Sequence, residues 1–183
     1  RPIAPRRATD VWRQVLDALS AIHDAGLVHR DIKPPNVLLT SKVNGRVKLC
    51  DFGMVKVPNA KGSRNGIWIG TLDYISPEQR KSAAEVDSRS DVYSAGVLMY
   101  RMLSSRLPTD VRAPLRGGRF GIPQALADLI DDCLRKQRRD RPTVAGDVLA
   151  RLDEIVPVIS VLPDVSKLPS RAAATKIIRG KVS

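Results

Sequence analysis

Residues 29–36 read His-Arg-Asp-Ile-Lys-Pro-Pro-Asn, and residues 51–53 read Asp-Phe-Gly. The first segment places a carboxylate, an ammonium and an amide in one short loop, and Asp51 adds a second carboxylate twenty residues past Asp31. Two carboxylates and an amide that converge form a hard oxygen site suited to Mg²⁺, which binds a few protein oxygens together with phosphate oxygens. A lysine beside them neutralises charge on a transferring phosphoryl group. Either aspartate alone would be interpreted as a turn residue, but the joint spacing favours a metal and phosphate site.

A helix and three short β-like runs surround this loop. Apolar residues recur at helical spacing over residues 9–25, with Thr9 as the expected N-cap and Gly26 as the stop. The β-like runs follow at residues 27–29, 36–39 and 47–50. Asn44-Gly45 lies between the last two runs and predicts a hairpin. Residues 51–70 show no period, and a loop of that length inside a compact domain is usually functional.

Three further helices are predicted downstream, over residues 88–104, 123–136 and 143–156. The first is apolar on more than one side, which is typical of a helix at the centre of a helical domain. Pro142 and Thr143 are suited to the start of the last helix. After Pro157 the chain becomes basic and rich in proline, and we interpret it as a linker or tail.

Three more motifs follow the first two in order: residues 70–79 (GTLDYISPEQ), residues 91–97 (DVYSAGV) and residues 140–142 (DRP). Together with H-R-D-x-x-x-x-N and D-F-G, they resemble the eukaryotic-type (Hanks-type) protein kinases. Lys33 and the Pro-Glu-Gln wording resemble the serine/threonine kinases of bacteria. The resemblance implies an α+β fold, mainly α: the C-terminal lobe of a protein kinase, with a small β-hairpin region and no N-terminal lobe.

The resemblance also implies the roles of the site residues. Asp31 would orient the substrate hydroxyl or accept its proton, and Lys33 would meet the γ-phosphate. Asn36 and Asp51 would hold the Mg²⁺ that bridges the phosphates of ATP. The other site residues implied are Thr71 beneath the substrate, Glu78 and Arg141 as a buried ion pair, and Asp91 as an acceptor of backbone hydrogen bonds from the catalytic loop. The substrate implied is a protein with serine or threonine hydroxyls.

One further hypothesis concerns regulation. Ser63 is the only hydroxyl residue between Gly53 and Thr71. In the resembled kinases an arginine at the position of Arg30 can grip a phosphorylated activation loop. We therefore hypothesise that phosphorylation at Ser63 or Thr71 orders the loop, with an unmodified, solvated serine as the alternative.

The resemblance covers residues 9–156 only. We predict a partial protein kinase domain over residues 1–156, from helix E of the family onward, and a basic tail or linker over residues 157–183. A glycine-rich loop, a strand lysine and its glutamate partner find no place ahead of the helix at Thr9. We therefore expect the isolated chain to be inactive and to need a missing N-terminal lobe for productive binding of ATP and Mg²⁺. The alternative is a non-catalytic, kinase-like C-lobe that binds proteins and competes for them.

Composition bounds the remaining options. The chain has 183 residues, a net charge of +12 and a hydrophobic fraction of 43%, which is enough to bury a core. Its longest nearly apolar run falls short of the ~20 residues that a membrane span needs. Scattered basic residues with only two Trp, three Tyr and two Phe argue against nucleic acid as the main ligand. Two cysteines favour a reducing, cytoplasmic compartment. Contact of the basic tail with acidic lipid, or a membrane tether in a longer parent protein, is the alternative to a solvated linker.

Overall fold

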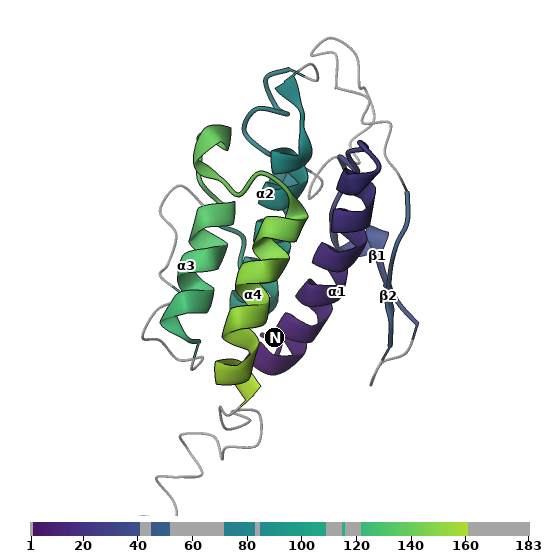
Figure 1. Ribbon diagram of the computed structural model, residues 1–183. Helices are drawn as coiled ribbons and strands as arrows, with labels where there is room; N and C mark the ends of the chain where they lie inside the picture. The colour runs from purple at the N-terminus through teal and green to yellow at the C-terminus, as the bar shows by residue number, and fades with distance from the viewer. Residues whose placement is uncertain are drawn as a thin grey trace, which may run out of the picture.

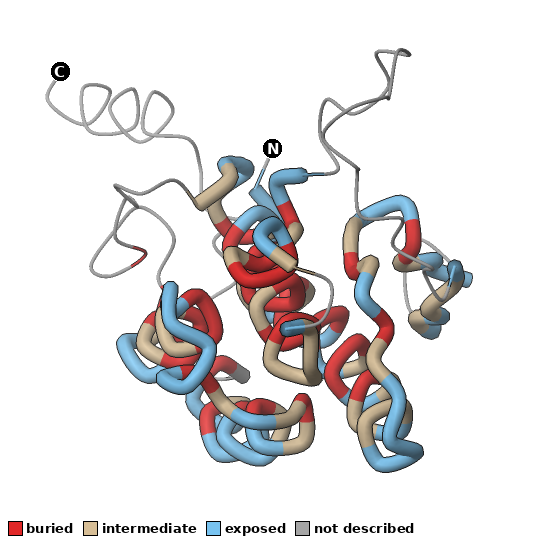
Figure 2. The backbone as a smooth tube through the Cα atoms, turned by 90° about the horizontal axis from the view of Figure 1, so that it is seen from above, coloured by how far each residue is buried: buried red, intermediate tan, exposed pale blue. Residues whose placement is uncertain are grey.

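The computed structural model describes residues 2–40, 45–51, 72–82, 85–108, 115 and 122–160. These residues form four α-helices and one antiparallel two-stranded sheet. Helices α1, α3 and α4 pack around α2, and the two strands lie against the outer side of α1 (Figure 1). The predicted class, mainly helical with one small β-hairpin, is confirmed for this part of the chain. Buried residues gather where the helices face one another, and exposed residues line the outside (Figure 2).

Helix α1 (Pro5–Asp24) begins one turn earlier than predicted. Pro5 occupies the first turn, where its missing N–H would have no helical partner and its fixed φ suits the helix. Thr9 therefore lies inside the helix, 1% exposed, and is not the N-cap. The helix ends as predicted before Gly26, whose φ of 73° is a left-handed conformation that glycine adopts without steric strain.

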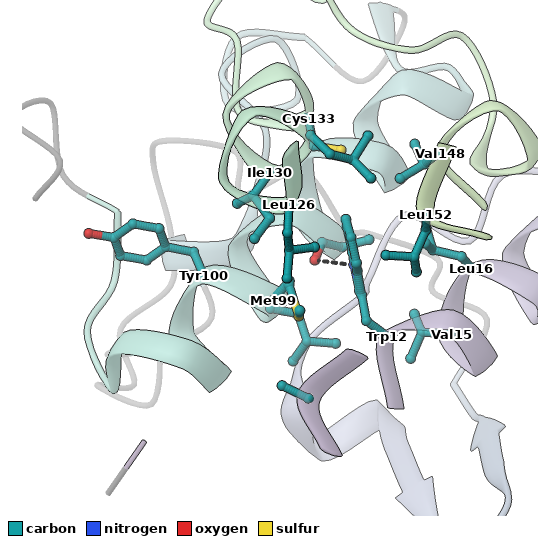
Figure 3. Packing of buried hydrophobic residues seen from close by; sticks show 14 of the residues in the cluster. Trp12, Val15, Leu16, Met99, Tyr100, Leu126, Ile130, Cys133, Val148 and Leu152 are labelled. Atoms are coloured by element: carbon teal, nitrogen blue, oxygen red, sulfur yellow. Dashed lines mark hydrogen bonds between the residues drawn. The ribbon is translucent and has the colours of Figure 1, made fainter. Parts of the chain in front are cut away.

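Helix α2 (Ser88–Ser104) has the predicted bounds. The carboxylate of Asp87 caps its first turn by accepting a hydrogen bond from the Arg89 N–H at 2.9 Å. Its buried residues lie all around the helix, as expected of a central element: Ser90, Asp91, Val92, Ser94, Ala95, Gly96, Val97, Leu98, Met99, Tyr100 and Leu103. The indole N–H of Trp12 in α1 donates to the carbonyl of Ala95 at 2.9 Å, which fixes α1 against α2 (Figure 3).

Close packing joins α2 to α3 (Gln124–Cys133). A Cβ placed on Gly96 would lie 2.8 Å from the Cβ of Cys133, so the helices approach at a point that accepts no side chain on α2. Burial raises the pKa of the Cys133 thiol to about 12, and the group packs as a neutral, apolar side chain. Helix α3 ends at Cys133 and not at the predicted residue 136. The carbonyls of Arg135 and Lys136, just past its end, accept hydrogen bonds from Arg141.

Helix α4 (Ala145–Ser160) starts later than predicted and continues through Pro157. Proline inside a helix removes one backbone hydrogen bond. Ile155 and Ile159 lie one turn apart on the buried face, 9% and 2% exposed, and their burial offsets that loss. The first four residues of the tail predicted over residues 157–183 therefore belong to α4. Residues 161–183 lie outside the described residues, as does their contact with lipid. No helix in the described ranges is long and apolar enough to cross a membrane.

Strands β1 (Val37–Leu39) and β2 (Val47–Leu49) pair antiparallel, with Leu38 opposite Lys48. The third predicted β-like run, residues 27–29, is not a strand. Its last amide, His29 N–H, donates to the carboxylate of Asp91 and not to a neighbouring strand. The sheet therefore begins only after the loop of residues 29–36.

Candidate active site

Three polar side chains meet in the loop between α1 and β1. Lys33 Nζ lies 2.8 Å from Asp31 Oδ2, and the Asn36 amide donates to the same oxygen at 2.9 Å and to the Asp31 carbonyl at 2.8 Å. The Asp31 and Lys33 side chains are 22% and 20% exposed, whereas Asn36 is 3% exposed. The loop therefore leaves one carboxylate and one ammonium partly open to solvent, and the buried Asn36 amide fixes the carboxylate.

The carboxylate of Asp91, in the first turn of α2, anchors this loop. It accepts the backbone N–H of His29 at 2.7 Å and that of Arg30 at 2.7 Å. A carboxylate in the first turn of a helix is also favoured by the helix dipole. Gln79 completes the frame by donating its side-chain amide to the Arg30 carbonyl at 2.8 Å. The peptide groups on both sides of Arg30 are thus fixed before any ligand binds.

Two residues of the site have left-handed backbone conformations. Arg30 has a φ of 69° and Asp51 a φ of 56°. Such a conformation costs about 1–3 kcal/mol in a residue other than glycine, and it clusters at functional sites. At Arg30 the hydrogen bonds to Asp91 and Gln79 maintain it.

Asp51 reaches the site from the end of β2. The Cys50 N–H donates to the Asn36 carbonyl at 3.1 Å, so Asp51 follows directly after a residue bonded to the loop. The exposed carboxylate of Asp51 and the amide of Asn36 are oxygen donors of the type that Mg²⁺ prefers. Within the described ranges no three His, Cys, Asp or Glu side chains cluster into a metal-binding group. Phe52, Gly53, Ser63 and Thr71 lie outside these ranges.

Glu78 and Arg141 form a second, closed ion pair. The guanidinium donates to both carboxylate oxygens, at 2.7 and 2.8 Å, and the side chains of Arg141 and Glu78 are 0% and 7% exposed. Ser90 donates to the same carboxylate at 2.7 Å. Burial alone would raise the pKa of Glu78, but the hydrogen bonds from Arg141 and Ser90 outweigh it and lower the pKa to about 2.

The guanidinium of Arg141 has its full set of acceptors. Besides Glu78, it donates to the carbonyls of Arg135 at 2.7 Å, Arg89 at 3.1 Å and Lys136 at 3.2 Å. It also stacks 4.8 Å from the ring centroid of Tyr93. Because all five N–H groups of the guanidinium are thereby used, Arg141 joins the turn after α3 to the segment that holds Glu78 and to the first turn of α2.

His23 contributes to the site although its sequence position suggests a solvated helix residue. Its side chain is 1% exposed, and Nε2 lies 3.1 Å from Asp91 Oδ2. The sequence does carry a signal for this burial, because His23 continues at helical spacing the stripe of Trp12, Leu16 and Leu19. A histidine at the end of an apolar stripe is thus placed toward the core, where it needs a polar partner.

Comparison with known proteins adds an independent finding. The family described as "Protein kinase domain" matches residues 1–151. The chain is 46% identical over 118 residues to serine/threonine-protein kinase pkn2 of Myxococcus xanthus, and 47% identical over 108 residues to serine/threonine-protein kinase PknL of Mycobacterium tuberculosis. It is 35% identical over 189 aligned residues to serine/threonine-protein kinase A of Synechocystis.

These alignments cover a large share of this chain and a small share of each relative. They include 62%, 58% and 89% of this chain, respectively. They include only 14%, 26% and 36% of the relatives' own lengths. The 183 residues therefore correspond to a minor part of each of these longer proteins.

Proposed function

Because the chain belongs to the protein kinase family, with serine/threonine kinases of bacterial type among its relatives, we propose that it supplies the half of a kinase active site that faces the hydroxyl accepting the phosphoryl group. The reaction is transfer of the γ-phosphoryl group of Mg-ATP to a serine or threonine hydroxyl of a protein. The observation that carries this proposal is the Asp31, Lys33 and Asn36 cluster on a loop fixed by Asp91. The chain is accordingly the C-terminal lobe of the kinase fold.

In this proposal the two exposed charges act on opposite partners. The Asp31 carboxylate orients the substrate hydroxyl and accepts its proton as the oxygen attacks phosphorus. The Lys33 ammonium stabilises negative charge on the transferring phosphoryl group. Asn36 holds the carboxylate in place through its bonds to the side chain and backbone of Asp31. The 2.8 Å separation of Asp31 and Lys33 keeps both groups at one reacting centre.

Asn36 and Asp51 are the residues proposed to hold Mg²⁺. When bound, the ion neutralises phosphate charge as the β–γ bond breaks. Among the described residues, Asn36 and Asp51 are the two side chains that we propose supply oxygen, which suits a cation that shares its coordination sphere with phosphate and water. The bond from Cys50 to Asn36 keeps the two ligand-bearing segments together.

Phosphorylation is the proposed regulation of this site. Arg30 is exposed beside Asp31, with a fully bonded backbone, so its guanidinium is presented to solvent next to the catalytic loop. A phosphate on Ser63 or Thr71 would find a charge-assisted partner there. Phosphopeptide mapping after incubation of the active protein with ATP tests this, and an unmodified loop in a fully active enzyme would remove the idea.

The experiment that tests the main proposal compares two polypeptides. The 183 residues include no glycine-rich loop and strand lysine ahead of α1, so we expect this polypeptide alone to bind Mg-ATP weakly and to transfer negligible phosphate. Joining the N-terminal lobe of a bacterial serine/threonine kinase to its amino end should produce transfer to a protein substrate. Asp31→Asn should then abolish that transfer.

Asp24→Asn provides the matched control, because Asp24 is exposed at the end of α1 and is not a partner in the hydrogen bonds that fix the loop. Robust turnover by the 183-residue polypeptide, or by the fused Asp31→Asn variant, would contradict the proposed roles. A fused protein that folds and binds ATP but never transfers phosphate would favour the alternative, a kinase-like C-lobe that binds proteins without catalysis.

A further inference from the structure

A cavity of about 590 Å³ lies between the start of α1, the strand β1 and the second half of α2. Its apolar lining includes Val11, Val37, Leu39, Leu98 and Met102. The Ile3 N–H donates to the Met102 carbonyl at 2.7 Å, which holds the segment before α1 against α2 at the edge of this cavity. The volume is in the range of sites that bind small ligands, and it is large enough for the side chains of a peptide.

Two arginines carry the charge of this cavity, and none of the described residues that line it is acidic. Arg101, exposed on α2, donates to the Tyr74 hydroxyl at 2.5 Å and lies 5.8 Å from the centroid of the same ring. Burial raises the pKa of Tyr74, so its hydroxyl is neutral near pH 7. These contacts therefore fix the guanidinium of Arg101 without cancelling its charge.

Arg7, the second arginine of the cavity, brings an unsatisfied donor. Its Nη2 atom is buried and has no hydrogen-bond partner among the residues that the structure describes. A buried donor without an acceptor is costly, and the cost is removed when an acceptor oxygen arrives. The Arg7 guanidinium therefore favours the binding of an anionic group in the cavity that its side chain lines.

The cavity begins beside the loop of residues 29–36. Pro34 lines it and follows Asp31 by three residues, so the Cα atoms of these two residues are at most about 11 Å apart. An extended peptide covers the same distance in about three residues. A peptide with its hydroxyl at Asp31 can therefore place a side chain a few residues away in the cavity.

We propose that this cavity is a docking site for the acidic side chains of a protein substrate, and that Arg101 and Arg7 select glutamate or aspartate near the hydroxyl that accepts the phosphoryl group. A guanidinium binds a carboxylate through two parallel hydrogen bonds. The apolar walls contact the CH₂ groups of the same side chain and reduce screening by water. That the bound peptide is a substrate rests on the proposed function, whereas the binding of an acidic peptide does not.

Fluorescence anisotropy of the 183-residue polypeptide with three labelled peptides tests the proposal. Each peptide has one central serine among alanine and leucine residues. The peptides differ only in the residue placed about three positions before and after the serine, which is glutamate, glutamine or lysine. We expect the glutamate peptide to bind about tenfold more tightly than the glutamine peptide, because a hydrogen bond between charged groups is stronger than one to a neutral amide. The lysine peptide should bind most weakly.

Charge changes at the two arginines give the sharper test. Arg101→Glu should remove the preference for glutamate, because one positive and one negative group then line the cavity, and the new carboxylate can still accept a hydrogen bond from Tyr74. Adding Arg7→Gln should reverse the preference in favour of the lysine peptide, a gain that an unfolded variant cannot show. Arg6→Glu is the matched control, since it makes the same change of net charge at an exposed residue that does not line the cavity.

Three results would overturn the docking site: no saturable binding of the glutamate peptide, equal binding of the glutamate and glutamine peptides, or a shift in Arg6→Glu as large as that in Arg101→Glu. In the fused kinase, kcat/KM for the three peptides should follow the order of binding, and equal values would also overturn the proposal. The expected order of binding without any phosphate transfer would support the docking site and count against the proposed function. Failure of one is thus distinguishable from failure of the other.

Discussion

Two ion pairs of this molecule have nearly the same contact distance and opposite surroundings. Asp31 and Lys33 meet at 2.8 Å with 22% and 20% of their side chains exposed, whereas Glu78 and Arg141 meet at 2.7 Å with 7% and 0% exposed. The open pair belongs to a loop and has one face toward solvent. The closed pair is surrounded by carbonyl groups and an aromatic ring. The same chemistry thus makes a structural joint at one place and, in the proposed function, serves a reaction at the other.

The difference teaches that saturation of hydrogen bonds, more than the presence of charge, separates structural from reactive groups. Every N–H of Arg141 has an acceptor within the fold, so nothing remains to bind a ligand. The ammonium of Lys33 keeps access to solvent and can exchange Asp31 for phosphate oxygens. If the two pairs differ in kind, substitutions in the buried pair should change the free energy of unfolding more than substitutions in the open pair.

The largest effect is expected from opening the closed pair. Arg141→Ala leaves the Glu78 carboxylate buried without its partner, and the loss should be about 3–5 kcal/mol of unfolding free energy. Urea unfolding at neutral pH measures it. Arg139→Ala is the matched control, because the Arg139 side chain in the same turn is 83% exposed, and it should change stability by less than about 0.5 kcal/mol. Equal losses of unfolding free energy in Arg141→Ala and Arg139→Ala would contradict the expected difference between the buried and the partly exposed ion pair.

Acid should weaken the closed pair in a defined interval. The pKa of Glu78 is lowered from 4.5 to about 2, so the carboxylate stabilises the fold above about pH 4.5, and that stabilisation is lost as the pH falls to about 2. The amount is about 3 kcal/mol. Between pH 7 and pH 2, the free energy of unfolding measured with urea should fall more steeply with decreasing pH for the native chain than for Glu78→Gln. Parallel curves would contradict the assignment.

The close contact between Gly96 and Cys133 involves no charge. It tests whether tight packing in the same interior contributes as much to the free energy of unfolding as the buried ion pair does. Gly96→Ala would put its Cβ 2.8 Å from that of Cys133 and force α2 and α3 apart. We expect a loss of about 1–3 kcal/mol, despite the better helix propensity of alanine. Gly146→Ala is the control, since its nearest contact is the movable Ser20 hydroxyl at 3.0 Å. Thermal unfolding of both variants decides whether tight packing alone approaches the effect at Arg141.

The smallest effect on stability is expected at the open pair. Asp31→Asn removes one charge from a pair that water already screens, so the unfolding free energy should change by less than about 1 kcal/mol. The same substitution abolishes transfer in the fused kinase if Asp31 has its proposed role. A loss of stability as large as that of Arg141→Ala would show that the two pairs do not differ in kind.

Sequence patterns predicted the elements whose signals are local. Helix α2 was predicted at its true bounds from its dense apolar residues. In the structure Asp87 caps its start, and Ser105 follows its end in a left-handed conformation. The start of α1 was wrong, because Pro5 at the first turn was outweighed by the more familiar cap residue Thr9. Residues 27–29 looked like a strand because Leu27 and Val28 are apolar, but the His29 amide is bonded to Asp91, distant in sequence. Long-range partners of this kind leave no local pattern.

For the site, motif spacing indicated which residues belong to the loop, and the structure brings Asp31, Lys33 and Asn36 into contact. Spacing did not reveal His23, because a polar residue near the end of a helix is ordinarily solvated. Its polarity suggested an outward position, whereas its place on the stripe of Trp12, Leu16 and Leu19 put it inside. A buried histidine is identified only when its partners, here Asp91 and the Ala145 amide, are located in space.

The left-handed backbone at residues 30 and 51 has a consequence for evolution. Glycine and asparagine adopt φ values of 69° and 56° more readily than most residues. Selection for folding stability alone would therefore favour glycine or asparagine at positions 30 and 51. In the proposed function, a guanidinium is needed at position 30, and selection for it would act against that change. Among natural variants of this chain, the residue at position 30 can therefore serve as a tracer that separates lineages still under selection for a working active site from lineages that keep only the scaffold.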